Sequence, residues 1–327
     1  MQNQTTVPIL SPKQRKALVF SLVLAAALYL LVVFLAGYKD ISSAFQRFGL
    51  TNWLIVLLCS GINYSLRFLR WQHYIKQARH SIPLGRHFLY YLAGFALTTT
   101  PGKAGETLRS MLLRPHGVDY PFSLACFFTE RFLDVIVVAL LASLTVFAFN
   151  EYSGFVIITS LSILSLLPYI RSALFINQLI KIDHWLKKPK LKKLLHHFTH
   201  LIRSMHILLS WKLIGFGLTV GMMAWLIQGF AFYLIITELG FSVTLLAALG
   251  IYAISLLAGA VSFIPGGVGS TEIVMALLLA ALGADTSIVV SAPIISRLST
   301  LWFAVLLGLL STTGLTLKPT TKDGVIS

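Results

Sequence analysis

Two stretches of the chain combine a proline–glycine break with a glutamate and a later arginine. The breaks are Pro101-Gly102-Lys103-Ala104-Gly105 and Pro265-Gly266-Gly267-Val268-Gly269. Glu106 directly follows the first break, and Glu272 follows the second after two hydroxyl residues. An arginine lies 25 positions after each glutamate, Arg131 in the first case and Arg297 in the second. Because guanidinium groups suit phosphate oxygens and a nearby acid can moderate the binding or carry a proton, these residues could form an anion site.

The elements that position these charges are strongly apolar. The 327 residues are 57% hydrophobic and only 11% charged, and their mean hydropathy is +0.82. Soluble domains carry about 25% charged residues, so this composition excludes a soluble globular domain and predicts a polytopic membrane protein. Cys59 and Cys126 both lie in apolar runs, which argues against a disulfide framework or a thiolate metal site.

Hydropathy along the chain predicts full spans and two interrupted regions. The predicted spans are Ala17–Ala36, Thr51–Leu69, Phe122–Phe149, Gly154 to about Phe175, Leu213–Thr237 and Ser287–Gly314. His87–Leu113 and Thr244–Leu282 contain the two breaks, which leave pieces too short to cross a bilayer alone. We therefore expect an all-α polytopic membrane protein, a single integral membrane domain over 1–327, with about six full spans and two re-entrant helical hairpins.

The uneven charges predict an orientation. The chain has 26 lysines and arginines against 11 aspartates and glutamates, a net charge of +15. If the N-terminus is cytoplasmic and both hairpins return to the side they entered from, nineteen basic residues fall in cytoplasmic segments and two, Lys39 and Arg47, in outer loops. We therefore expect a multi-pass protein of a bacterial or archaeal cytoplasmic membrane, with both termini cytoplasmic. The basic excess then reflects topology, and nucleic acid is excluded as a partner. Arg67 and Arg70 are predicted to extend toward cytoplasmic headgroups.

The two broken regions repeat one pattern. Break, glutamate and arginine recur in the same order with an offset of 164 to 166 residues. We interpret this as a duplication, with halves at approximately 51–149 and 213–314. Three predicted spans separate the breaks, so the second hairpin would enter from the opposite face. Such inverted repeats are typical of secondary transporters, which bind their ligand near the midplane.

The longest polar stretch, 177–212, is too short to fold as a catalytic domain. From Leu191 to Leu209 its apolar side chains recur at helical spacing, with lysines, an arginine and histidines on the other face. This predicts an amphipathic helix on the cytoplasmic surface, attracted to anionic lipids. No carboxylate joins the histidines of this segment, so we interpret them as part of a solvated basic face rather than a metal site.

Nine charged residues remain at or near membrane depth. They are Arg67, Lys103, Arg109, Arg131, Arg297, Glu106, Glu130, Asp134 and Glu272. Nine charges facing lipid alone would cost roughly 20–30 kcal/mol, so we expect them to face an internal polar cavity or one another. Arg131 and Asp134 are three residues apart and can pair on one helix face, and Glu106 and Arg109 have the same spacing.

Two interpretations of these charges stay open. In the structural one, each glutamate caps the helix that follows its break, and Arg131 and Arg297 hold hairpin carbonyl groups. In the functional one, the half-helix N-termini and the basic side chains bind a phosphate-bearing lipid headgroup at the midplane. The predicted substrate-binding residues are Lys103, Glu106, Arg109, Glu130, Arg131, Asp134, Gly266, Gly267, Gly269, Ser270, Glu272 and Arg297. We predict no catalytic residue, no metal ligand and no cofactor.

Three motifs together resemble a known family. They are Thr100-Pro101-Gly102-x-x-Gly105-Glu106-x-x-Arg109, Thr129-Glu130-Arg131-x-x-Asp134 and Ile264-Pro265-Gly266-Gly267-x-Gly269-x-x-Glu272. This ordered set resembles the lysylphosphatidylglycerol synthase transmembrane family, the flippase-like part of bifunctional aminoacyl-phosphatidylglycerol synthases, which also occurs as stand-alone membrane proteins. The resemblance covers most of the chain. Lys103 occupies a position that is often arginine in the family.

The resemblance implies translocation of a modified phospholipid. In bifunctional members a soluble C-terminal aminoacyl-transferase domain makes that lipid. This sequence ends at Ser327, soon after the last predicted span, so we expect a stand-alone member and do not carry aminoacylation over. Stand-alone relatives are often associated with isoprenoid- or glycan-linked lipids. The implied partners are therefore an anionic phospholipid or an isoprenoid-linked lipid.

Three functions remain in competition. The first is a lipid flippase or scramblase; the sequence contains no GxxxxGK[ST] motif, so direct ATP drive is not expected. The second is an integral-membrane transferase or hydrolase of a lipid phosphate, against which no DDxxD-type acidic cluster is present. The third is a non-catalytic helper that binds a separate lipid-modifying enzyme, or that acts as a homo-oligomer. The residues favour a non-enzymatic role.

Overall fold

The computed structural model describes residues 38–99, 107–147, 153–172 and 204–317, with a few isolated positions outside these ranges. Every regular element within the described ranges is helical, which confirms the predicted all-α class. The predicted span Ala17–Ala36 and most of the predicted amphipathic segment 177–212 lie outside the described residues. Three described helical segments are long and apolar enough to cross a membrane: Ser43–Ala78, Trp211–Glu238 and Thr286–Leu315.

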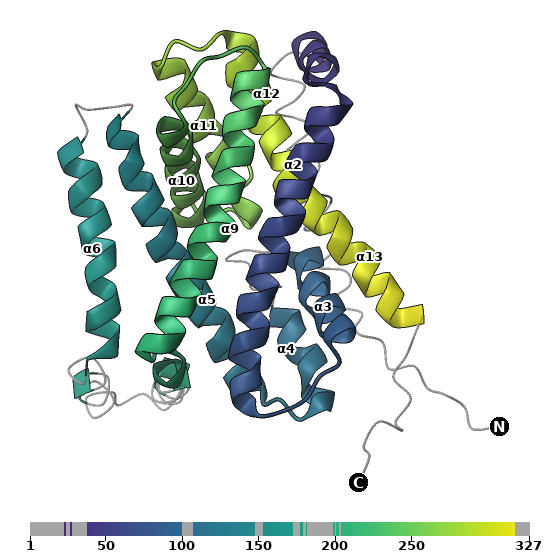
Figure 1. Cartoon of the computed structure of the whole chain (residues 1–327), viewed down its shortest axis with the longest axis vertical. Helices are drawn as coiled ribbons and strands as arrows, with labels where there is room; N and C mark the ends of the chain where they lie inside the picture. The colour runs from purple at the N-terminus through teal and green to yellow at the C-terminus, as the bar shows by residue number, and fades with distance from the viewer. Residues whose placement is uncertain are drawn as a thin grey trace.

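Helix α2 (Tyr38–Ile75) packs along α9 (Trp211–Glu238) in the centre of the bundle (Figure 1). Three side-chain hydrogen bonds join the two helices at successive levels: Asn52 to Glu238, Gln228 to Ser60, and Asn63 to the carbonyl oxygen of Ala224. Residue numbers rise on α2 as they fall on α9, so the helices are antiparallel. Farther along, the Tyr74 hydroxyl donates to the carbonyl oxygen of Leu213. The paired length, from position 52 to 74, is about 33 Å at 1.5 Å per residue, close to the thickness of a hydrocarbon core.

Two helical hairpins occupy opposite ends of this bundle (Figure 1). The first consists of α3 (Leu84–Ala93), the 3₁₀ turn η2 (Gly94–Leu97) and α4 (Leu108–Leu113). The second consists of α10 (Leu245–Val261), η7 (Pro265–Gly267) and α11 (Ser270–Ala281). In Figure 1 the helices of the first hairpin lie in the lower half of the bundle and those of the second in the upper half. The second interruption, between α10 and α11, lies at Pro265-Gly266-Gly267, where the sequence predicts it. The first predicted break, Pro101-Gly102-Lys103-Ala104-Gly105, lies outside the described residues.

The remaining described elements connect these parts. They are η1 (Lys76–Ala78), η4 (Arg114–His116), α5 (Tyr120–Ala142), η5 (Ser143–Phe147), α6 (Ser153–Arg171), α12 (Thr286–Arg297), the π-helical turn η8 (Leu298–Trp302) and α13 (Phe303–Leu317). Helix α5 follows the first hairpin, and the continuous helical segment Thr286–Leu315 follows the second, so the order long helix, hairpin, long helical segment occurs twice.

The second break depends on glycine. Gly266, Gly267 and Gly269 have φ angles of 65°, 65° and 87°, in the left-handed region that other residues rarely adopt. Helix α10 approaches this break through Gly259, where an added Cβ would overlap the Thr271 hydroxyl. The Pro-Gly sequence therefore sets both the turn and the close packing of the two hairpin arms.

Each hairpin packs against a helix from the other half of the chain, the first against α13 and the second against α5. Helix α13 packs against α3 and η2, and α10 packs against α5 and η5. Both contacts are made at a glycine: a Cβ on Gly308 would overlap the backbone nitrogen of Ala96, and one on Gly250 would overlap that of Thr145. The short hairpin helices bury their apolar faces through these exchanged contacts.

The described end of segment 177–212 packs on the protein. Ile202, Met205, Leu208 and Leu209 are buried in the apolar core that includes Trp71 of α2. These positions belong to the predicted apolar face. In this described part that face contacts the helical bundle.

Substitution of Gly308 tests the clamp between the halves. We expect Gly308→Ala to lower stability by about 1–3 kcal/mol, because the new methyl group displaces the η2 backbone. Gly314→Ala on the same helix is the matched control, because nothing lies within 4 Å of the point that its Cβ would occupy. Thermal unfolding of both variants in detergent micelles measures the difference, and equal midpoints would contradict this packing.

Candidate anion site at the centre of the bundle

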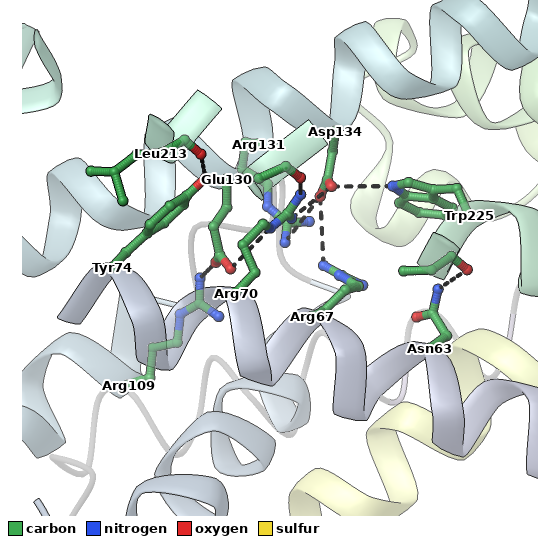
Figure 2. A network of polar contacts seen from close by, with 12 residues as sticks. Asn63, Arg67, Arg70, Tyr74, Arg109, Glu130, Arg131, Asp134, Leu213 and Trp225 are labelled. Carbon is green, nitrogen blue, oxygen red and sulfur yellow. Dashed lines mark hydrogen bonds and ion pairs between the residues drawn. The ribbon is translucent and has the colours of Figure 1, made fainter. Parts of the chain in front are cut away.

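A cluster of charged side chains lies where α2, α4, α5 and α9 meet (Figure 2). Asp134 of α5 is at its centre. Its Oδ1 accepts hydrogen bonds from Arg70 Nη2 at 2.7 Å and from Trp225 Nε1 at 3.1 Å. Its Oδ2 lies 3.4 Å from Arg131 Nη2 and 3.9 Å from Arg67 Nη2. Three guanidinium groups thus converge on one carboxylate, and the predicted local pairing of Arg131 with Asp134 is confirmed.

Glu130, one turn before Asp134 on α5, is the second carboxylate of the cluster and contacts Arg109 and Arg70. Its Oε2 accepts a hydrogen bond from Arg109 Nη2 at 2.6 Å, and its Oε1 lies 3.6 Å from Arg70 Nε. The Arg109 guanidinium also stacks on Trp71, with Cζ 3.7 Å from the ring centroid. A cation over an indole face gains electrostatic stabilisation in addition to its ion pair. Glu130 and Arg70 are completely buried, so this part of the cluster is shielded from solvent.

Positive charge exceeds negative charge in this cluster. Among the described residues, four guanidinium groups surround two carboxylates. Lys103 and Glu106, which the sequence also assigns to the site, lie outside the described residues. Guanidinium groups donate hydrogen bonds in a geometry that suits phosphate and carboxylate oxygens, so a cluster of this composition can bind an anion.

The four arginines differ in accessibility. The exposed fraction of the side chain is 0% for Arg70, 1% for Arg109 and 7% for Arg67, but 19% for Arg131. Arg70 lies between the carboxylates of Glu130 and Asp134, and Arg109 lies between the Glu130 carboxylate and the Trp71 ring, so these two arginines tie the helices together. Arg131 is the cluster cation best placed to meet a ligand that enters from outside.

The prediction that Arg67 and Arg70 extend toward headgroups is wrong. Both are buried, and Arg70 also donates from Nη1 to the carbonyl oxygen of Gly217 on α9 at 3.3 Å. The apolar run ends at Leu69, but helix α2 continues to Ile75, so Arg70 stays on the helix face that meets α9. At Gly221 an added Cβ would lie 2.8 Å from Arg70 Nη1, so glycine makes room for the guanidinium.

A periodic signal in the sequence could have identified this buried face. The polar or aromatic-polar residues on it are Ser60, Asn63, Arg67, Arg70 and Tyr74. They are three or four positions apart, the spacing of a helix face that packs against another helix. A hydropathy average over the same region conceals this pattern.

The second break carries its own ion pair. Arg297 Nε donates to Glu272 Oε1 at 3.0 Å, and Arg297 Nη2 donates to the carbonyl oxygen of Gly266. Glu272 Oε2 accepts from the backbone N–H of Gly269 at 2.9 Å, at the start of α11. The glutamate therefore caps the helix and the arginine holds a hairpin carbonyl, as the structural interpretation predicts.

The other predicted residues of the second break surround this pair. The Ser270 hydroxyl donates to the carbonyl oxygen of Gly267 at 3.2 Å and lies 2.9 Å from the Ser262 hydroxyl oxygen. Just after Arg297, the carbonyl oxygen of Thr300 in η8 accepts a hydrogen bond from the Tyr64 hydroxyl of α2. The second break is thus tied both to α12 and, through the π-helical turn, to the central helix.

The three predicted motifs therefore form two described groups. Arg109, Glu130, Arg131 and Asp134 belong to the central cluster, whereas the glycines, Ser270, Glu272 and Arg297 belong to the second break. Arg109 forms an ion pair with Glu130, 21 residues later on another helix. The predicted pairing of Glu106 with Arg109 lies outside the described residues. In the described residues no group of three or more histidine, cysteine, aspartate or glutamate side chains could hold a metal ion.

Comparison with known proteins agrees with these motifs. The family described as lysylphosphatidylglycerol synthase TM region matches residues 18–308. The chain belongs to this family. It is also similar to two archaeal proteins named UPF0104 membrane proteins. One, from Methanothermobacter thermautotrophicus, is 22% identical over 319 residues, covering 89% of this chain and 92% of the relative. The other, from Pyrococcus horikoshii, is 24% identical over 320 residues, covering 88% and 94%. The family and these relatives establish a membrane protein.

Substitution of the buried arginine should affect folding. We expect Arg70→Gln to destabilise the protein by about 3–5 kcal/mol, because Glu130 and Asp134 then lose the cation that joins them. Arg131→Gln should change stability far less, because its side chain is partly exposed. Thermal unfolding in detergent compares the two variants, and a similar loss in both would contradict the assignment of Arg70 as the structural cation.

A double-mutant cycle tests whether the ion pair between Glu272 and Arg297 stabilises the second break. We expect Glu272→Gln and Arg297→Gln to be coupled by about 0.5–3 kcal/mol, because they share a buried ion pair and one hairpin turn. The exposed hydrogen bond between Asn52 and Glu238 is the matched control, for which Asn52→Ala and Glu238→Gln should show coupling of at most about 1 kcal/mol. Additive effects at positions 272 and 297 would show that the pair does not hold the break.

Proposed function

We propose that this protein translocates an anionic phospholipid or a lipid-linked precursor across the membrane, as a flippase or scramblase. The observation that carries the proposal is the buried cluster in which, among the described residues, four guanidinium groups surround two carboxylates. A phosphate headgroup that leaves water for the bilayer interior loses its hydration, and this loss is the main barrier to its crossing. Guanidinium donors at depth replace the lost hydrogen bonds and balance the charge.

The two carboxylates make the binding reversible. Asp134 contacts Arg131 and Arg67 on the same side, so it competes with an incoming phosphate for their donors. A transport site must bind strongly enough to admit the headgroup and weakly enough to release it. An internal acid that reoccupies the guanidinium groups after release meets both requirements.

The arrangement of the hairpins supports alternating access. We propose that the two hairpins are re-entrant and enter from opposite membrane faces, as inverted repeats at approximately 51–149 and 213–314. Their positions at opposite ends of the bundle suit this topology (Figure 1). In this arrangement both termini are cytoplasmic, and small movements of one half against the other expose the cluster to either side. The archaeal relatives are consistent with a place in a bacterial or archaeal cytoplasmic membrane.

The residues divide into contact and positioning roles. Arg131 is the proposed contact to the phosphate, and Arg70, Arg109 and Glu130 position it by fixing α2, α4 and α5 together. The glycines of the second break, Ser270, Glu272 and Arg297 shape the second hairpin. Lys103 and Glu106 remain proposed contacts on the basis of the sequence.

Lipid movement in proteoliposomes tests the proposal. We expect the purified protein to move labelled phosphatidylglycerol or a polyprenyl phosphate between leaflets, and to move phosphatidylcholine much more slowly. Arg131→Gln should reduce the rate by about tenfold or more, because one charge-assisted hydrogen bond to the headgroup is lost. Arg131→Lys should keep part of the rate, since the charge remains but the two-donor geometry does not.

The control variant is Lys212→Gln, which removes an exposed positive charge at the start of α9 and should leave the rate unchanged. An unchanged rate in a folded Arg131→Gln protein would contradict the proposed role of that residue. No movement of either anionic lipid would contradict transport of these lipids and favour the helper role. Release of a cleaved or transferred phosphate would favour a transferase or hydrolase.

A further inference from the structure

An apolar groove and a basic pocket meet on the outer side of α2. The groove encloses about 680 Å³ between α2, α3 and α13, and the pocket encloses about 260 Å³ between the end of α2 and the start of α3. Gln72 lines both cavities, so they adjoin along one helix. Neither cavity takes part in the central charge cluster.

The groove has the dimensions and chemistry of a site for a hydrocarbon chain. Leu58, Ile62 and Leu69 line it from α2, and Phe88 of α3 and Leu307 of α13 close its other sides. From position 58 to 72 the helix rises about 21 Å, which is more than half the thickness of a hydrocarbon core. A chain lying in the groove would therefore stay at the depth of one leaflet.

The pocket at the end of the groove is positively charged. Lys76, Arg79 and His80 line it, and among the described residues no acidic side chain does. Arg79 closes the η1 turn with a φ angle of 59°, which fixes the backbone that presents these groups. The His80 ring packs against Gly117, where an added Cβ would lie 2.9 Å from the ring, so the loop before α5 holds the histidine in place.

We infer that the groove and the basic pocket together form an entry site for one membrane lipid with a phosphate headgroup. The hydrocarbon chain lies along α2 in the groove, and the phosphate contacts Lys76 and Arg79. Charge complementarity selects this occupant, because an apolar chain site that ends in a cluster of cations matches a lipid that carries an anion at its end. The role of the site in delivery rests on the proposed function, whereas the binding of the lipid does not.

Only thin layers of side chains separate this entry site from the central cluster. Tyr64 and Phe68 line the groove, and Tyr64 packs against Phe95 with ring centroids 5.2 Å apart. The Arg67 guanidinium lies over the same Phe95 ring, with Cζ 5.9 Å from the ring centroid. A rearrangement of these aromatic side chains would connect the groove with the guanidinium groups.

A second thin layer of side chains separates the basic pocket from the central cluster. His87 lines the pocket and accepts a hydrogen bond from Trp71 Nε1 at 3.0 Å. Trp71 also contacts the central cluster, because the Arg109 guanidinium stacks on its ring. The pocket and the cluster are therefore adjacent at the headgroup end as well.

Photolabelling of the full-length protein tests the entry site. The probe is phosphatidylglycerol with a diazirine in its acyl chain, in vesicles of phosphatidylcholine, and the labelled peptides are identified by mass spectrometry. We expect adducts on α2 between positions 58 and 69 and on α3. Gly61→Phe should abolish most of this labelling, because nothing lies within 4 Å of the Gly61 Cβ position and the ring would occupy the groove. Gly215→Phe on α9, also in open space, is the matched control and should leave labelling unchanged.

A second pair of variants tests the headgroup contact. Lys76→Gln with Arg79→Asn should weaken phosphatidylglycerol labelling by about tenfold or more, since each basic residue contributes on the order of 1 kcal/mol. Asparagine is chosen at position 79 because it tolerates a positive φ. A diacylglycerol probe with the same diazirine chain should be unaffected by these changes. Lys212→Gln with Arg114→Asn removes two exposed charges elsewhere and should change neither probe.

Three results would overturn the inference. They are labelling that persists in Gly61→Phe, loss of both probes alike in the charge variant, and a crosslink from benzoylphenylalanine at position 62 to residues 1–37 of the chain itself instead of to lipid. Failure of the proposed function is distinguishable from these. Labelling in the groove without lipid movement would support the binding site and overturn transport. Lipid movement without labelling in the groove would support transport and overturn the binding site.

Discussion

The burial of Arg70 between Glu130 and Asp134 is the interaction on which the centre of the fold depends. A guanidinium with no exposed surface is tolerated only when acceptors surround it. Here the two acids come from α5 and a further acceptor, the carbonyl oxygen of Gly217, from α9. One side chain therefore fixes three helices at one level. Gly221 on α9 follows from the same requirement, because an added Cβ there would lie 2.8 Å from Arg70 Nη1.

This fixed centre explains how two short hairpins can be stable. Neither α3–α4 nor α10–α11 is long enough to bury its own apolar surface, so each needs a partner from outside its half. Gly308 and Gly250 let the backbones of the two halves approach closely, and the exchange of contacts makes each half complete the other. Stability is thus shared between halves.

Features that depend on residues close together in the chain could be predicted from the sequence. Hydropathy located the three described helical segments that are long and apolar enough to cross a membrane. The second Pro-Gly run located the interruption between α10 and α11, and the spacing of Arg131 and Asp134 predicted their contact. The environment of Arg70 was not predictable from hydropathy, because it depends on carboxylates 60 and 64 residues away on another helix. The partner of Arg109 is likewise set by tertiary packing. Only the periodic polar face of α2 indicates in advance that these arginines point inward.

Under the proposed function, the shared contacts of Asp134 would let the cluster exchange ligands while each charge keeps a partner. When no ligand is bound, Asp134 shares the guanidinium groups of Arg67, Arg70 and Arg131. A phosphate bound at Arg131 as proposed would replace one of these contacts, while Arg70 would keep its ion pair with Asp134 at 2.7 Å. Neither the incoming anion nor the internal acid is then left unpaired at any step. Under the proposed function, an acid that shares several guanidinium groups would admit the headgroup without losing its last cation, and it would compete for the same donors when the headgroup leaves.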